Sequence, residues 1–263
     1  MVTIQQETCT GCARCVKDCV FGNLEMRNGK AAVKGDCIRC GHCVAICPVY
    51  AASLPEYDMA DIEVYQKEAF TVNPDHFLRA IKFRRSIRFF KPKQIEKDKL
   101  ARIIQAGRYT ATAVNLQDVR FMVVQNSLPR FKEMIWQGWG KAVQKMIDKN
   151  HPQANRFADY LAAYRQDPKQ DRLFFNAPVA LILAADVPLD AGLAAANLEN
   201  MAVAEGLGVL YDGYVIMALA ESPEAKEWIQ LGDKRPIACL LLGYPDVSYK
   251  RTAPRRKADL VWK

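Results

Sequence analysis

The sequence predicts an α+β fold in two parts, a small cysteine-rich unit followed by a larger domain of helices and strands. Eight of the nine cysteines lie within the first 47 of the 263 residues. From residue 75 onward, stretches with apolar residues at helical spacing are interrupted by short apolar runs. Because these stretches follow no regular strand–helix–strand repeat, the pattern favours α+β over a doubly wound parallel sheet.

The cysteine-rich unit contains the same spacing twice, C-x₂-C-x₂-C-x₃-C, and Pro48 follows the second copy. This spacing is typical of chains that hold two [4Fe–4S] clusters. A tight loop with a cysteine at every third residue supplies three of the four thiolates of a cluster, and the fourth must come from elsewhere. Small residues beside the cysteines, Gly11, Ala13, Gly41 and Ala45, leave room for backbone N–H groups to approach the sulfurs.

This segment resembles the bacterial two-cluster ferredoxins, in which the last cysteine of each run crosses over to the other cluster. The resemblance implies two ligand sets: Cys9, Cys12, Cys15 and Cys47 for one cluster, and Cys37, Cys40, Cys43 and Cys19 for the other. Such an arrangement implies a ferredoxin-like fold and an electron carrier.

Zinc and disulfides are the competing interpretations of these cysteines. Zinc sites usually take two separated cysteine pairs and do not need a third cysteine at the same step. Disulfide frameworks suit short secreted chains, and no charged-then-apolar leader precedes the cysteines. We therefore expect reduced thiolates and a cytoplasmic location. Cys239 lies in an apolar run, residues 237–242, where we expect a small core residue.

The order of elements predicts three segments: a cluster-binding unit at residues 1–50, a connecting arm at 51–74 and a second domain at 75–263. Asn28-Gly29 predicts a hairpin turn in the first segment, and Asp75 is the expected N-cap of the first helix of the domain. The expected helices after that one are 95–109, 129–148, 152–164 and 189–207, and the expected strands are 119–124, 178–185 and 237–242.

The formal charge of +8 is concentrated in two segments. Residues 79–102 hold ten basic side chains against Glu96 and Asp98, and residues 250–263 hold six against Asp259. Two such clusters could converge on one anion or form two solvated faces. Neither carries a nucleic-acid-binding signature, so no nucleic acid is expected. The longest apolar stretches are too short to cross a bilayer, so no membrane partner is expected either.

A phosphate motif is predicted within the first of these basic segments. The run Arg84-Arg85-Ser86-Ile87-Arg88 offers guanidinium groups and a hydroxyl that suit a phosphate. A surface cluster of arginines would look similar. No glycine-rich dinucleotide loop of the form G-x-G-x-x-G follows a strand, so a Rossmann domain is not expected.

Residues 75–263 resemble the nitroreductase family of FMN enzymes. The resemblance rests on the motif at residues 84–88, the segment 111–117, the run 171–179, the segments 205–208 and 211–213, and residues 243–245 with the basic tail after them. Two positions depart from the family pattern. Ala111, Thr112 and Ala113 replace a proline-serine-rich segment, and Asp118-Val119 replaces the usual Pro-Trp.

The resemblance implies the residues that would bind FMN. Arg84, Arg85 and Ser86 would hold the phosphate together with Arg255 or Arg256. Asn115 and Gln117 would lie near the isoalloxazine and ribityl groups. Tyr211, Asp212 and Gly213 would form the turn against the flavin, with N–H groups of Asp212 and Gly213 directed at the N5 edge. An ordinary turn after the glycine-terminated helix is the alternative for these last residues.

Members of the family are intertwined homodimers, so the resemblance implies a homodimer. The segment that begins at Phe131 also holds Trp136, Trp139, Phe157, Tyr160 and Tyr164, which either shape a substrate pocket or form ordinary core.

Iron–sulfur clusters carry single electrons, whereas a flavin collects two. We therefore expect an FMN-dependent oxidoreductase in which electrons pass through two [4Fe–4S] clusters to FMN, which reduces a nitroaromatic, a quinone or an activated alkene. The donor would be a protein such as ferredoxin, or NAD(P)H. The alternative is an electron relay between redox partners with no organic substrate of its own. No side chain is assigned as a catalytic acid or base.

Overall fold

The computed structural model describes residues 1–263 and divides them into two compact units. The first unit contains residues 1–71 together with the short segment Thr112–Leu116, and the second contains Val72–Ala111 and Gln117–Lys263. Contacts therefore extend the first unit beyond the expected boundary at residue 50 and place part of the expected arm within it.

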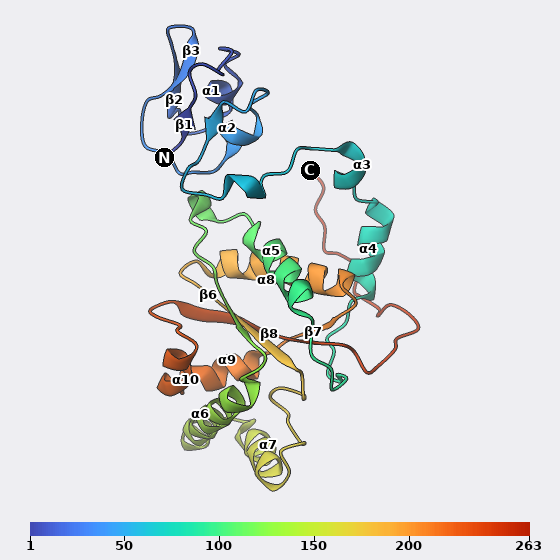
Figure 1. The fold of residues 1–263 in the computed structure, drawn as a ribbon. Helices are drawn as coiled ribbons and strands as arrows, with labels where there is room; N and C mark the ends of the chain where they lie inside the picture. The colour runs from blue at the N-terminus through green and yellow to red at the C-terminus, as the bar shows by residue number, and fades with distance from the viewer. The chain divides into compact units, whose positions relative to one another are not determined.

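The first unit is built from short elements around the cysteines (Figure 1). Its strands and helices are β1 (Thr3–Ile4), α1 (Arg14–Asp18), β2 (Leu24–Arg27), β3 (Lys30–Val33), α2 (His42–Ala45), β4 (Ala52–Ser53), η1 (Met59–Asp61), α3 (Lys67–Phe70) and, from the later segment, η2 (Ala113–Asn115).

Two antiparallel pairs, β1–β4 and β2–β3, hold the first unit together. The predicted hairpin turn is confirmed, because Asn28 and Gly29 join β2 to β3 with φ values of 51° and 77°. Both values lie in the left-handed region that this pair of residues tolerates. Pairing of β4 with β1 brings the chain after Cys47 back beside the N-terminus.

The second unit is a four-stranded sheet covered by helices on both faces. Its elements are α4 (Pro74–Phe83), α5 (Lys97–Arg108), β5 (Arg120–Val124), α6 (Leu128–Asp148), α7 (Ala154–Gln166), β6 (Val179–Ala185), α8 (Pro188–Ala204), β7 (Gly208–Tyr211), α9 (Gly213–Ala220), α10 (Pro223–Trp228) and β8 (Arg235–Gly243). Strand order is β5-β6-β8-β7, with every neighbouring pair antiparallel. A parallel bridge between Ser86 and Val209 extends the β7 edge.

Strand β6 shows why the sheet needs helices on both sides. All seven of its residues are buried, and alternate side chains face opposite layers. Val179, Leu181 and Leu183 pack in the layer of α5 and α8, whereas Ala180 and Ile182 pack in the layer of α6 and α9 (Figure 1). Cys239 is buried opposite Ile182, which confirms the expected core role of this cysteine.

The expected helices are present with small shifts at their ends. Helix α4 begins two residues earlier than expected, and its N-cap is Asn73, whose side chain accepts a hydrogen bond from the His76 N–H at 2.9 Å. Asp75 therefore lies in the first turn and is not the cap. Pro74 explains the shift, because proline suits the first helical position, where its missing N–H leaves no intrahelical bond unmade.

Helix α8 ends as the glycine signal predicts. Gly206 has a φ of 76°, its N–H donates to the Val203 carbonyl, and the Leu207 N–H donates to the Ala202 carbonyl. These two bonds form a Schellman motif. The short strand β7 follows at once and was not expected from the sequence. None of the helices combines the length and the hydrophobicity that a transmembrane span requires.

Candidate functional site

The eight N-terminal cysteines form two separate cages. Two cavities in the first unit are each lined by four of them. The first cage consists of Cys9, Cys12, Cys15 and Cys47. The second cage consists of Cys19, Cys37, Cys40 and Cys43. Both sets agree with the crossed ligand sets implied by the ferredoxin resemblance, and neither is spaced for a single metal ion.

Backbone donors surround the sulfurs of both cages. The N–H groups of Ala51, Asn23 and Arg39 donate to the Sγ atoms of Cys47 (3.2 Å), Cys19 (3.3 Å) and Cys37 (3.3 Å) respectively. Hydrogen bonds of this kind stabilise thiolate ligands and raise the reduction potential of a cluster. The donor set therefore suits two [4Fe–4S] clusters.

The cysteines of the two cages differ in burial and in backbone hydrogen bonds, and their pKa values differ as a result. Burial raises the pKa of Cys15 and raises that of Cys43 to about 11. Burial also acts to raise the pKa of Cys47, but backbone N–H donors outweigh it and the pKa is lowered. Ligation by iron would hold all of these thiols deprotonated.

In the second unit, the predicted phosphate motif runs along the edge of the sheet beside β7. The Ile87 N–H donates to the Val209 carbonyl at 3.0 Å, and the Ile87 side chain is buried against Gly208. A Cβ atom at Gly208 would lie 2.6 Å from Cγ1 of Ile87, so glycine is required for this close approach. Strand β7 thereby fixes the backbone that carries Arg84, Arg85 and Ser86.

The arginines of the motif have partners of different kinds. Arg84 Nη1 lies 3.1 Å from Glu199 Oε1 on α8, in a half-buried ion pair. Burial raises the pKa of Glu199, and the guanidinium of Arg84 acts against that effect. The guanidinium of Arg85 lies 5.9 Å from the ring centre of Tyr249. A guanidinium offers five N–H donors, so Arg84 can donate to a ligand while one of its N–H groups bonds to Glu199.

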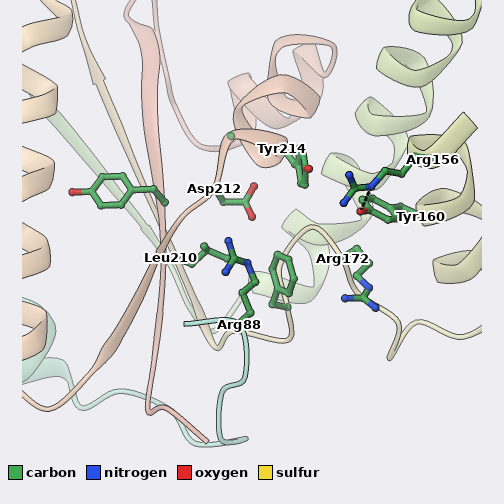
Figure 2. Close-up of a pocket in the computed structure, with 10 residues that line it drawn as sticks. Arg88, Arg156, Tyr160, Arg172, Leu210, Asp212 and Tyr214 are labelled. Atoms are coloured by element: carbon green, nitrogen blue, oxygen red, sulfur yellow. Dashed lines mark hydrogen bonds between the residues drawn. The ribbon is translucent and has the colours of Figure 1, made fainter. Parts of the chain in front are cut away.

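A cavity of about 450 Å³ opens next to this motif, at the end of β7 and the beginning of α9 (Figure 2). Its lining includes the predicted residues Tyr211, Asp212 and Gly213. It also includes residues that the sequence did not single out for binding: Arg88, Arg156, Tyr160, Arg172, Phe175, Leu210 and Tyr214. A volume of this size is within the range of small-molecule sites.

Asp212 lies at the centre of this lining and is 5% exposed. Its carboxylate accepts a hydrogen bond from the Val215 N–H at 2.9 Å and so caps α9. Burial raises the pKa of Asp212 to about 6, while the cap and the charge of Arg88 act in the opposite direction. Burial likewise raises the pKa of Tyr211 to about 12.

The structure does not bring the remaining predicted FMN residues into this cavity. Asn115 belongs to the first unit, where its side-chain amide donates to the carbonyls of Ile38 and Arg39 at 3.0 Å each. Gln117 belongs to the second unit and does not line the cavity. Arg255 and Arg256 are exposed on the irregular C-terminal tail and have no ion pair. Arg84, Arg85 and Ser86 do not line the cavity either. The flavin contacts of all the predicted residues stay predictions.

The aromatic residues of the segment 131–164 are mostly ordinary core. Trp136, Trp139 and Phe157 are at most 4% exposed, and Tyr164 stacks on Trp136 with ring centres 4.0 Å apart. Tyr160 is the one member of the set that lines the cavity. The core interpretation therefore holds for most of the set.

Comparison with known families decides the identity of the second unit. The model described as "Nitroreductase family" matches residues 81–244, which is more than half of the chain. The chain belongs to the nitroreductase family. The model described as "4Fe-4S dicluster domain" matches residues 1–60 of this nitroreductase. These matches confirm the predicted family and fold class and support the predicted cofactors.

Solved structures share the fold of the nitroreductase domain. A nitroreductase with bound FMN from Bacteroides fragilis NCTC 9343 is 20% identical, with 73% of this chain and 100% of that chain covered and a TM-score of 0.60. A nitroreductase with bound FMN from Desulfitobacterium hafniense DCB-2 is also 20% identical, over 73% and 99%, with a TM-score of 0.57. An FMN-dependent nitroreductase from Clostridium difficile R20291 is 18% identical, over 72% and 100%, with a TM-score of 0.53. No curated protein matches the sequence.

Proposed function

We propose that this nitroreductase is an iron–sulfur flavoprotein in which two [4Fe–4S] clusters deliver electrons to FMN for the reduction of a small organic acceptor. The observation that carries the proposal is the presence of two four-cysteine cages and a cavity beside an arginine–serine motif on one polypeptide. The acceptor class we propose is a nitroaromatic, a quinone or an activated alkene. Clusters supply one-electron transfer and FMN supplies two-electron chemistry when these groups are bound.

The residues around the cavity suit the binding and orientation of FMN. Arg85 and Ser86 offer a guanidinium and a hydroxyl for the phosphate, on a backbone held by β7. Gly213 begins α9 at the cavity, where the positive end of the helix dipole favours electron-rich atoms. The side chain of Asp212 is occupied by the cap of α9, so the turn is rigid when a ligand arrives.

The charge of the chain suits an acidic protein donor. The formal charge is +8, and complementary charge accelerates encounter with an acidic protein such as ferredoxin. The alternative function, an electron relay, shares this donor but needs no organic substrate. Both functions place FMN beside this cavity, so turnover of a small acceptor by the isolated protein decides between them.

A homodimer is the assembly we propose. Helix α4 contains no buried residue, and Phe77, Leu78 and Ile81 on it are 42–53% exposed. Exposed apolar residues grouped on one helix indicate a surface that a partner covers. A second copy of the chain fits the homodimers that the family resemblance implies.

Anaerobic turnover assays test the proposed function. Reduced ferredoxin, and separately NADH, is offered to protein loaded with iron, sulfide and FMN, and the acceptor is varied. We expect steady turnover of a nitroaromatic, a quinone or an activated alkene with reduced ferredoxin. Rapid flavin reduction with negligible turnover until a protein partner is added would instead support the relay.

Three variants connect that activity to the two sites. Cys12→Ser with Cys40→Ser disrupts both cages and should abolish turnover with ferredoxin, while chemically reduced FMN still reduces the acceptor. Arg85→Ala should lower FMN content and leave the iron content intact. Arg84→Ala alone would leave the Glu199 carboxylate without its ion-pair partner. Arg84→Ala is therefore combined with Glu199→Gln, which removes that charge as well. Retention of FMN in both arginine variants would remove the phosphate assignment.

A further inference from the structure

The cavity of the nitroreductase domain is lined by three guanidinium groups that no carboxylate neutralises. Arg88 is the last residue of the phosphate motif, Arg156 lies on α7, and Arg172 lies in the loop before β6. None of the three forms an ion pair with an aspartate or a glutamate. Figure 2 shows Arg88 on one side of the cavity and Arg156 with Arg172 on the other.

Neighbouring charges do not compensate for these arginines. Asp171 adjoins Arg172 in sequence, but its carboxylate is only 1% exposed and pairs with Lys132 at 2.7 Å. Asp212 is the one carboxylate in the lining, and its side chain caps α9 by accepting a hydrogen bond from the Val215 N–H. Three cations against one carboxylate leave a positive potential in the cavity, and a concave site strengthens such a field.

Aromatic rings fix the direction of two of the three guanidinium groups. Arg156 Nε donates to Tyr160 Oη at 2.8 Å, and its guanidinium carbon lies 5.6 Å from the centre of that ring. The guanidinium carbon of Arg88 lies 6.0 Å from the ring centre of Phe175. Arginines held in this way lose little conformational freedom when they bind an anion. The rings also offer an apolar surface to an aromatic ligand.

Phe175 itself is held in an uncommon backbone conformation. Phe175 and Asn176 have φ values of 51° and 54°, in the left-handed region that few residues other than glycine adopt. The Phe174 N–H donates to Asp171 Oδ1 at 2.8 Å, and the Phe175 N–H donates to the Asp171 carbonyl at 2.9 Å. This loop directs Phe175 into the cavity lining beside Arg172.

We propose that this cavity selects acceptors that carry a carboxylate on an aromatic ring, with Arg156 and Arg172 binding the carboxylate. The proposal deepens the proposed function, because it names the substrate class of the same site. Arg156 and Arg172 lie outside the phosphate motif, on segments separate from Arg84–Ser86, so the anion they bind is distinct from the phosphate of FMN. Arg88 adds positive charge on the opposite side.

Equilibrium binding to the oxidised holoprotein tests the proposal without any turnover. 4-Nitrobenzoate and 4-nitrobenzamide have nearly the same shape and differ in charge. Calorimetric titration should give a dissociation constant at least about tenfold lower for the benzoate, since a charge-assisted hydrogen bond contributes about 1.5–3 kcal/mol. Arg156→Gln and Arg172→Gln should each remove most of this preference and leave the affinity for the amide unchanged.

Arg165→Gln is the matched control, because Arg165 is an exposed arginine on the same helix α7 that does not line the cavity. It should keep the preference of the wild-type protein. Equal affinity of the wild-type protein for the two probes would overturn the proposal, as would an equal loss for both probes in the glutamine variants.

The FMN content of the glutamine variants distinguishes the carboxylate from the cofactor phosphate. Unchanged FMN supports a separate anion site, whereas loss of FMN would overturn the proposal and assign these arginines to the phosphate. A preference for 4-nitrobenzoate in binding, together with no turnover by any donor, would support the selectivity of the cavity and contradict the proposed function. The experiments therefore distinguish failure of the carboxylate selectivity from failure of the proposed function.

Discussion

At the scale of single residues, Asp212 connects the stability of the nitroreductase domain to its site. Its carboxylate caps α9, lines the cavity and is almost completely buried. Burial raises its pKa from 3.8 to about 6, so the folded chain holds this proton more tightly than the unfolded chain does. The free energy of unfolding therefore falls as the pH rises from about 4 to about 6, and the loss stays constant above that range.

Asp212→Asn should remove this pH dependence. Asparagine caps a helix as well as aspartate does and stays neutral, so the variant keeps the cap and loses the cost of a buried charge. We expect the variant to gain stability over the wild-type protein as the pH rises from 5 to 8, by about 1.4 kcal/mol. Urea unfolding followed by tryptophan fluorescence measures the difference, because all four tryptophans lie in the second unit.

Asp233→Asn is the control for this measurement, since Asp233 is exposed in the same unit. Its substitution removes a carboxylate without relieving any burial. A constant difference between Asp212→Asn and the wild-type protein across the pH range would show that the carboxylate is not responsible.

Residues differ in how far the sequence predicts their roles. Three ligands of each cage follow from a fixed local spacing, and the crossed fourth cysteine follows from the ferredoxin resemblance. Arg156 and Arg172 were not predicted as binding residues. They stand alone in sequence, and only the packing of α7 and the loop before β6 brings them to the cavity. The fifth residue of the phosphate motif, Arg88, was visible in the sequence but was not assigned a contact.

At the scale of secondary-structure elements, strand β7 shows what local patterns leave out. Helices α4 to α8 and three of the four strands of the second unit follow from apolar spacing, glycine and proline. Strand β7 has only four residues directly after the Schellman motif of α8, and its pairing with β8 and Ser86 involves distant parts of the chain. The sequence around Gly206 predicts the end of a helix but not the strand that follows.

Gly208→Ala should lower the affinity for FMN by displacing the phosphate motif. The added Cβ would lie 2.6 Å from Cγ1 of Ile87, so Ile87 and the arginines beside it must shift. We expect a destabilisation of about 1–3 kcal/mol and a lower FMN content, with unchanged iron. Chemical analysis of purified protein measures both cofactors.

Gly192→Ala provides the control for this substitution. Gly192 lies in α8, and nothing lies within 4 Å of a Cβ placed there. Alanine at an exposed helical position should stabilise the domain by about 0.5–1 kcal/mol and leave FMN binding intact. Normal FMN binding by Gly208→Ala would show that the motif tolerates the displacement.

The structure gives the segment Thr112–Leu116 a different role from the flavin contact that the family resemblance implies. Val114, Asn115 and Gln117 all have φ values between 42° and 58°. Within the first unit, the Asn115 amide closes the loop of the second cage through the carbonyls of Ile38 and Arg39. The sequence could not predict this contact, because the family resemblance directs the same residue to the flavin.

Asn115→Ala should loosen the second cage. Loss of two hydrogen bonds to the loop between Cys37 and Cys40 should accelerate the release of iron to a chelator and leave FMN in place. Asn155→Ala, at an exposed position of α7, is the control and should release iron at the wild-type rate. Loss of FMN from Asn115→Ala with unchanged iron release would instead support the flavin contact.

At the scale of the whole molecule, the apolar residues of α4 form the surface that we propose a second copy covers. Phe77, Leu78 and Ile81 lie at helical positions i, i+1 and i+4 and are all exposed. Leaving three large apolar side chains in water costs about 1.5–3 kcal/mol for each one that could be buried. A monomer would carry this cost in full, whereas a second copy that covers the helix would remove it.

Charged substitutions on α4 should therefore dissociate the homodimer. Phe77→Asp with Ile81→Asp places two carboxylates on the face that we propose is covered, and sedimentation equilibrium should show a monomer where the wild-type protein shows a dimer. Lys82→Glu changes the charge of the same helix at an exposed polar position and should leave the dimer intact. A wild-type monomer, or a dimer that survives both aspartates, would mean that α4 is covered by something other than a second copy.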